Sequence, residues 1–155
     1  MSMSWRTNLC LVFLALYVLQ TTSVPHQFHV RIHNDIGGVE YKLVTHCFSR
    51  DDDLGTHILK PNQVRAWTFH DVIWPGKHSV FVCDFLWKNL YNRFEVINTG
   101  WPNMCDKLNK PGCRTYHWSV KSDGFYLAIG DNPVPSDYEF KDSWQGPRLI
   151  KSINV

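Results

Sequence analysis

Short runs in which apolar and polar residues alternate fill most of the sequence between residues 28 and 129. In the first run Phe28, Val30 and Ile32 alternate with histidine and arginine. A period of two residues is typical of β-strands. Gly, Pro, Asn and Asp separate the runs, and Asp123-Gly124 between two of them is a strong hairpin signal. The predicted strand runs are 28–33, 41–47, 64–70, 78–87, 90–98, 115–121 and 125–129.

This number of short strands at close spacing predicts an all-β fold, and a small antiparallel β-sandwich rather than a barrel. No amphipathic stretch is long enough to predict a helix. Residues 101–114 are irregular and contain two cysteines. Residues 131–155 are rich in proline and polar residues, and we expect them to form a poorly ordered tail beyond a domain at 24–130.

Residues 1–23 have the pattern of a secretory signal peptide. The polar start carries Arg6, and an apolar run, LCLVFLALYVL, covers residues 9–19. That run is shorter than the roughly 20 residues that span a bilayer, so we expect cleavage after Ser23, no membrane insertion of the mature chain, and an extracellular location. Cleavage would lower the formal charge from +2 to +1, which does not suggest a nucleic-acid-binding protein.

Of the five cysteines, Cys10 lies in the signal peptide. The other four form an even set in a secreted chain, which predicts two disulfides. Zinc binding is less favoured because no Cys-x-x-Cys pair is present. Three pairings are possible. We favour Cys47 with Cys113 and Cys83 with Cys105, because these bonds would tether the irregular segment to the sheet.

The acidic stretch Asp51, Asp52 and Asp53 raises the question of a calcium site. Calcium loops space their ligands at alternate positions and add a late glutamate, whereas adjacent aspartates do not all converge on one ion. We therefore predict a turn closed by local hydrogen bonds, with Gly55 in a conformation that favours glycine, and no metal site. Gly-rich phosphate-binding loops are also missing, and no cofactor is expected.

His46 and His117 lie in predicted strands and raise a second alternative, a secreted ribonuclease that uses general acid–base catalysis. The H-G-L-W-P block of one class of secreted ribonucleases is absent. Tryptophans stacking on sugars would instead indicate a carbohydrate-binding module, but Trp67, Trp87 and Trp118 lie in strand patterns typical of a core.

Four motifs in order carry a family resemblance. The stretch HCFSRDDDLG at residues 46–55 resembles the signature of the plant self-incompatibility S1 proteins, also called S-protein homologues. Trp67 and Phe69 resemble that family's W-x-F element, and FVCDF at residues 81–85 resembles its F-x-C-x-F strand. Cys113, Trp118 and the Asp-Gly pair that follows resemble its C-terminal block. The resemblance runs from about residue 30 to residue 129.

The resemblance implies an immunoglobulin-like β-sandwich with two disulfides, and a secreted, non-enzymatic ligand that binds a plasma-membrane protein receptor on plant cells. The carbohydrate or cell-wall module and the histidine-dependent ribonuclease remain alternatives. Loops gather at the ends of a sandwich, where exposed polar and aromatic side chains contact partners. The candidate partner-binding residues are Asn34, Asp35, Arg50, Asp51, Asp52, Asp53, Trp74 and Lys77.

Overall fold

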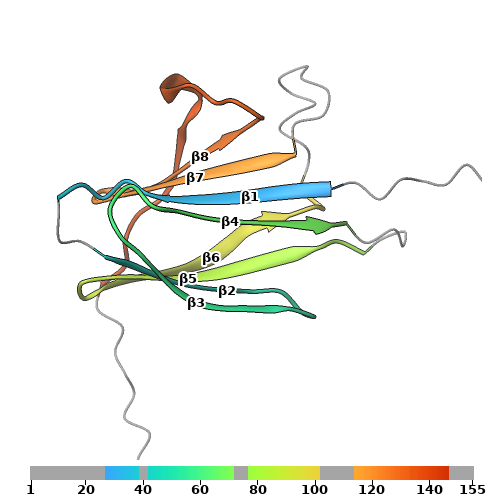
Figure 1. Cartoon of the computed structure of the whole chain (residues 1–155), viewed down its shortest axis with the longest axis horizontal. Coiled ribbons are helices and arrows are strands. Elements are labelled where there is room, and N and C mark those ends of the chain that lie inside the picture. The colour runs from blue at the N-terminus through green and yellow to red at the C-terminus, as the bar shows by residue number, and fades with distance from the viewer. Residues whose placement is uncertain (1–26, 39–41, 72–76, 102–113, 147–155) are drawn as a thin grey trace, which may run out of the picture.

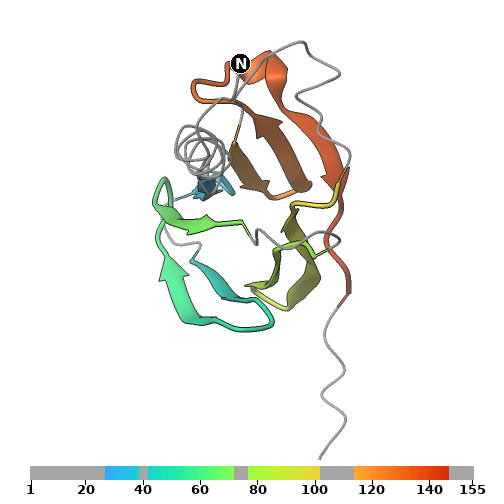
Figure 2. The same cartoon turned by 90° about the vertical axis from the view of Figure 1, so that its right-hand side faces the viewer.

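The computed structural model describes residues 27–38, 42–71, 77–101 and 114–146, and nearly all regular structure in these ranges is β-strand. Two sheets pack face to face as a sandwich (Figure 1, and end-on in Figure 2). The five-stranded sheet has the order β4-β1-β7-β8-β9, and the four-stranded sheet has the order β3-β2-β5-β6. The all-β sandwich predicted from the alternation is confirmed.

Strands from both halves of the chain make up each sheet. The five-stranded sheet contains β1 (Gln27–Asn34), β4 (Val64–His70), β7 (Thr115–Lys121), β8 (Gly124–Ile129) and β9 (Glu139–Asp142). The four-stranded sheet contains β2 (Leu43–Phe48), β3 (Asp53–Leu59), β5 (Val80–Trp87) and β6 (Leu90–Asn98). Neighbouring strands are antiparallel except β1 and β7, which pair in parallel. β1 lies between β4 and β7.

Aromatic side chains from both sheets fill the space between them. Phe125 lies with its ring centroid 5.0 Å from that of Phe85, 4.9 Å from that of Phe94 and 4.6 Å from that of Trp144. The buried indole of Trp118 donates a hydrogen bond to a β6 carbonyl at 2.9 Å, which satisfies its polar N–H. The inward positions of the predicted strands therefore form one core, as the alternation indicates.

The prediction of a poorly ordered tail from residue 131 is wrong for residues 131–146. These residues form the short 3-10 turn η1 (Pro135–Asp137) and the edge strand β9, and Gln145 then pairs with Tyr91 of β6. Trp144 packs on the core and donates a hydrogen bond from its indole to the Lys121 carbonyl at 2.8 Å. One half-buried tryptophan fixes a segment whose proline and polar residues indicated a tail. Residues 147–155 lie outside the described residues.

The predicted disulfide pairing is also wrong. Cys47 is bonded to Cys83, so neither can bond to Cys105 or Cys113, which lie outside the described residues. Cys47 of β2 and Cys83 of β5 stand directly opposite each other on antiparallel strands, with Cα atoms 4.1 Å apart and both side chains in the core. The sequence could not show that β2 and β5 are neighbours, since β3 and β4 separate them in the chain.

Candidate functional site

The acidic turn, residues 49–55, comprises the connection between β2 and β3 and the first residues of β3, at one end of the sandwich (Figure 1, right). The Ser49 hydroxyl accepts hydrogen bonds from the backbone N–H groups of Asp51 at 3.3 Å and Asp52 at 2.9 Å. The Asp53 carboxylate accepts one from the Gly55 N–H at 2.8 Å, and Gly55 has φ +68°. The predicted turn and its glycine conformation are confirmed, with a serine hydroxyl as one of the closing groups.

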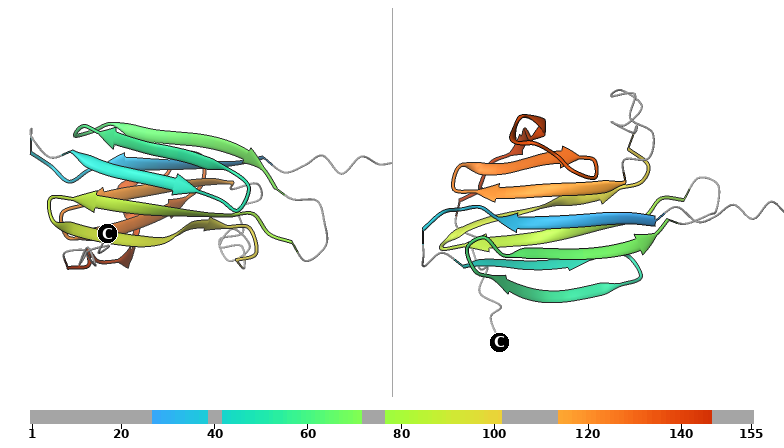
Figure 3. Two further views of the ribbon diagram at one scale, coloured as in Figure 1. Left: turned by 90° about the horizontal axis from the view of Figure 1, so that it is seen from below. Right: turned by 45° about the horizontal axis from the view of Figure 1, so that its top comes forward.

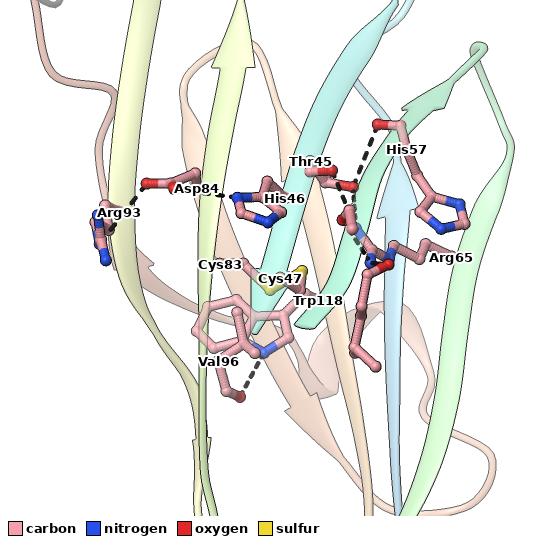
Figure 4. The surroundings of a disulfide bond; sticks show 12 residues. Thr45, His46, Cys47, His57, Arg65, Cys83, Asp84, Arg93, Val96 and Trp118 are labelled. Atoms are coloured by element: carbon pink, nitrogen blue, oxygen red, sulfur yellow. Dashed lines mark hydrogen bonds and ion pairs between the residues drawn. A yellow bond between two sulfur atoms is a disulfide. The ribbon is translucent and has the colours of Figure 1, made fainter. Parts of the chain in front are cut away.

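A buried arginine supports the turn from behind. Arg65 of β4 reaches across to the other sheet, where its guanidinium donates to the carbonyls of Leu54 at 2.9 Å and Gly55 at 3.1 Å. The same group donates to the carbonyl and hydroxyl of Thr45 at 3.0 and 2.9 Å (Figure 4). Burial lowers the pKa of Arg65, but the group is still charged at neutral pH. Arg65 therefore fixes the position of the turn relative to both sheets.

A polar network lies on the outer face of the four-stranded sheet next to the turn. The His46 imidazole contacts the Asp53 carboxylate at 2.8 Å and lies 3.8 Å from the carboxylate of Asp84 (Figure 4). Asp84 in turn accepts a hydrogen bond from the Tyr91 hydroxyl at 2.6 Å and lies 3.7 Å from the Arg93 guanidinium. The hydrogen bonds from the Gly55 N–H and His46 hold the pKa of Asp53 below its ordinary value.

A groove of about 780 Å³ lies at the same end of the molecule. Its walls bring together Arg50, Asp51 and Asp52 of the acidic turn and Lys77, which precedes β5. All four side chains are exposed, and none makes a hydrogen bond or ion pair with another residue in the described ranges. Four of the predicted partner-binding residues therefore lie on one surface, and the fold does not use their charges.

The remaining candidates lie elsewhere. Asn34 is completely buried, and its side-chain amide donates to the Leu59 carbonyl at 2.9 Å, so the prediction that it contacts a partner is wrong. It supports the chain where β1 ends. Asp35 is exposed but accepts a hydrogen bond from the Ser119 hydroxyl at the opposite end of the sandwich from the acidic turn. Trp74 lies outside the described residues.

The two histidines considered for catalysis do not share a site. His46 lies on the outer face of the four-stranded sheet, whereas His117 of β7 belongs to the five-stranded sheet and faces away from the core. Sheets in a sandwich lie about 10 Å apart, so the two imidazoles cannot act on one substrate together. Instead, His117 stacks on His33 with ring centroids 5.9 Å apart, and its Nε2–H donates a hydrogen bond to the Gly130 carbonyl at 3.0 Å.

Because of the stacked pair, we expect the folding stability of the protein to fall in acid. Burial is the largest effect that lowers the pKa of both His33 and His117. The neighbouring His33 lowers the pKa of His117 further, against the opposing hydrogen bond to Gly130, and Asp35 opposes the lowering at His33. Because the charged imidazoles are disfavoured in the folded state, their contribution to stability is complete above about pH 6.5 and is lost as the pH falls below it. We expect the thermal midpoint to fall by a few degrees between pH 7 and pH 5.5.

The variants His33→Gln and His117→Gln combined should flatten this pH dependence, measured by circular dichroism during heating. The exposed His57 provides a matched control, and His57→Gln should keep the full slope. If the double variant kept the wild-type slope, another group would be responsible.

Several residues of this surface were not predicted. Phe48, Asp84 and Arg93 line one hollow with His46, and the Tyr91 hydroxyl donates a hydrogen bond to Asp84. Of these residues only Phe48 belongs to the same strand as His46. Their contacts depend on strand register, which the sequence does not contain. In the described ranges, no group of three or more His, Cys, Asp or Glu side chains is arranged to hold a metal ion. No helix in the same ranges is long and apolar enough to span a membrane.

Comparisons with known proteins agree with the fold and the motif order. The family model described as plant self-incompatibility protein S1 matches residues 29–144. S-protein homolog 13 of Arabidopsis thaliana is 30% identical over 135 residues, which is 81% of this chain and 81% of that protein. S-protein homolog 12 of the same plant is 31% identical over 121 residues, which is 77% of this chain and 72% of that protein.

A solved structure has the same fold. It is described as one of the SPH (Self-Incompatibility Protein Homologue) proteins, a widespread family of small, highly stable, secreted proteins from plants. The alignment has a TM-score of 0.55 at 20% sequence identity, and it covers 79% of this chain and 98% of the solved one.

Proposed function

Because this chain belongs to the plant self-incompatibility protein S1 family, we propose that it is a secreted, non-enzymatic ligand that binds a protein partner on the surface of plant cells. The S1 name and the secreted nature of the related SPH proteins support this assignment. The predicted signal peptide at residues 1–23, which lies outside the described residues, supports it independently.

The observation that carries the proposal is the surface formed by Arg50, Asp51, Asp52 and Lys77. Charged side chains that the fold leaves unpaired stay available to a partner, and they steer association through the field that they create. The turn that presents Arg50, Asp51 and Asp52 is held by Ser49 and the buried Arg65, so these three charges are displayed on a rigid support. Rigid display lowers the ordering cost of binding.

The first test uses the full-length sequence expressed in a eukaryotic secretion host and purified from the medium. N-terminal sequencing should find residue 24 first. The labelled protein should bind intact plant cells saturably, and mild protease treatment of the cell surface should abolish that binding. Binding that survives protease but is competed away by wall polysaccharides would reject the protein partner in favour of the carbohydrate module.

A charge reversal locates the surface. Asp52→Lys should weaken cell binding several-fold, because it places a like charge against a partner selected for the acidic turn. Glu139→Lys makes the same change in charge on exposed β9 of the other sheet and serves as the matched control. Equal weakening by both variants would mean that binding depends on overall charge rather than on this turn.

A further inference from the structure

The strand β4 forms one outer edge of the five-stranded sheet. Among the described residues it pairs only with β1, in an antiparallel register that runs from Gln27 opposite His70 to His33 opposite Val64. Figure 3 (right) shows β4 (green) beside β1 (blue), on the side away from β7 (orange). One side of β4 therefore has no neighbouring strand in the described part of the chain.

The pairing of β1 shows which backbone groups of β4 face this open side. The N–H of His29 in β1 donates to the Arg114 carbonyl at 2.9 Å, so the odd-numbered residues of β1 direct their backbone groups toward β7. The even-numbered residues of β1 therefore bond to β4, where they stand opposite odd-numbered residues. The even-numbered residues of β4, which include Ala66 and Thr68, direct their N–H and C=O groups away from β1. We call this row of backbone groups the free edge of β4.

The other three edge strands carry features that hinder pairing with a further strand. The register of β3, of β6 and of β9 is interrupted by a bulge. β9 is only four residues long, and three of these are charged. Tyr91 of β6 already exchanges backbone hydrogen bonds with Gln145, and β3 contains Gly55 with φ +68°. These three edges are therefore protected.

β4 has none of these features. It contains seven residues in an unbroken register with β1. Its outward-facing side chains are all exposed, and no lysine, arginine, aspartate or glutamate is among them: Val64, Ala66, Thr68 and His70. Its one such residue, Arg65, is buried. A long, regular and uncharged edge is one to which another extended chain can add, and its contrast with three protected edges indicates a binding site.

The free edge of β4 leads to the groove beside the acidic turn. Phe69 and His70, the last residues of β4, line that groove together with Lys77 and residues of the acidic turn. Arg65 of β4 donates hydrogen bonds to two carbonyls of the turn, so the edge and the turn are held in a fixed relation. An extended chain that pairs along β4 is therefore led to the unpaired charges of the groove.

The side chains of β4 indicate the sequence pattern of such a chain. Trp67 and Phe69 pack on the core but remain partly exposed. In a strand added to β4, alternate side chains would lie beside these two rings, and the others would lie beside Ala66 and Thr68. Apolar side chains would cover the rings, whereas small or polar ones suit the outward positions. The edge therefore fits an extended polypeptide in which apolar and polar residues alternate.

We propose, building on the function proposed above, that the partner protein adds an extended segment to β4 as a further strand of the five-stranded sheet. Main-chain hydrogen bonds to Ala66 and Thr68 hold the segment, and the residues that follow it reach the groove. A second copy of this chain fits less well. Antiparallel pairing of two β4 strands would bring the turn at residues 60–63 of one copy to the groove of the other, and this turn, closed by the bond from the Gln63 N–H to the Lys60 carbonyl, leads the chain away from the edge.

The mode of binding can be tested before the partner is known. The probe is a peptide of the same length as β4 that alternates valine with threonine, added at millimolar concentration to the isotopically labelled secreted protein. Amide exchange followed by NMR should slow at Ala66 and Thr68, because their N–H groups become bonded to the peptide. The same peptide with every amide N-methylated should have no effect. Equal protection by the methylated peptide, or no protection by the unmodified one, would overturn the proposal.

A variant links the free edge to cell binding. Ala66→Pro removes an N–H that faces the free edge and breaks no bond to β1, so the fold should be retained. Binding to plant cells should weaken roughly tenfold, because a carbonyl of the partner is left without its donor. The control Ala66→Thr keeps the N–H in a residue suited to strands and should bind like the wild type. Thermal midpoints check both variants, and the peptide experiment decides the proposal if Ala66→Pro does not fold.

The outcomes separate the two proposals. If the wild-type protein fails to bind cells, the proposed function fails, and the peptide experiment alone decides whether β4 accepts a strand. If the wild type binds and folded Ala66→Pro binds equally well, strand addition at β4 is wrong and the ligand function stands. A dimer seen by sedimentation that Ala66→Pro dissociates would place a second copy on β4 and would also overturn the proposal.

Discussion

Replacement of both Cys47 and Cys83 by alanine should lower the free energy of unfolding by about 4 kcal/mol. The bond closes a loop with a sequence separation of 36 residues, which lowers the conformational entropy of the unfolded chain. Removal of the bond restores that entropy and so stabilises the unfolded state. For a domain of this size the loss is a large share of the total stability. Urea denaturation followed by tryptophan fluorescence measures the change directly.

Two comparisons make this result specific to the bond. Wild-type protein in a reducing agent should lose at least as much stability, and the alanine variant should lose less on reduction than the wild type does. Peptide mapping under non-reducing conditions should recover Cys47 linked to Cys83. A peptide that links Cys47 to Cys105 or Cys113 would contradict the structure, as would an alanine variant with unchanged stability.

Phe125→Ala should cost about 3–5 kcal/mol, the range for large-to-small changes of a buried aromatic residue. Phe125 is completely buried and contacts aromatic rings from β5, β6 and the segment that follows β9. Its loss leaves a cavity that neighbours on separate strands cannot fill without moving the sheets. The same denaturation measurement gives the value.

Phe140→Ala is the matched control, because it removes the same atoms from a ring that is 55% exposed on β9. Its only described ring contact is an edge-on one with Tyr126. The expected change is within about 0.5 kcal/mol. Comparable losses for Phe125→Ala and Phe140→Ala would mean that the aromatic cluster does not dominate the core.

The strands and the core were largely predictable because burial on one face imposes a period of two on the sequence. Seven predicted runs correspond to strands, and Trp118 lies in the core as its pattern indicates. The hairpin at Asp123-Gly124 is confirmed as well. Gly124 has φ +149°, and a Cβ there would meet the Asp142 carbonyl oxygen, so both conformation and space require glycine.

Two of the four edge strands, β3 and β9, were not predictable, for the same physical reason. Most residues of β3 and β9 are exposed or half-buried, so neither strand shows the contrast between a buried and an exposed face. Asp53, expected in the turn, already belongs to β3. The place of β9 at the edge of the five-stranded sheet could not be predicted either, because no local sequence pattern shows that this segment pairs with β8.

Part of the candidate site could be predicted from the sequence, and part of it could not. The acidic turn, its charged residues and Lys77 were predictable, since loop charges are read directly from the sequence. The contacts of His46 with Asp53 and Asp84 depend on which strands are neighbours and in what register. One sequence signal does indicate an apolar position on the outer face. Val44 shares its predicted outward face with His46 and Lys42, where a polar residue is the ordinary choice.

The parallel pairing of β1 with β7 sets an order of assembly during synthesis. All strands of the four-stranded sheet lie between Leu43 and Asn98, so this sheet and its disulfide can form while the C-terminal part of the chain is still being made. β1 is made first, yet its place between β4 and β7 is complete only when residues 115–120 arrive. The earliest strand to emerge must therefore wait for one of the last, and during that wait its unpaired edge is exposed to aggregation.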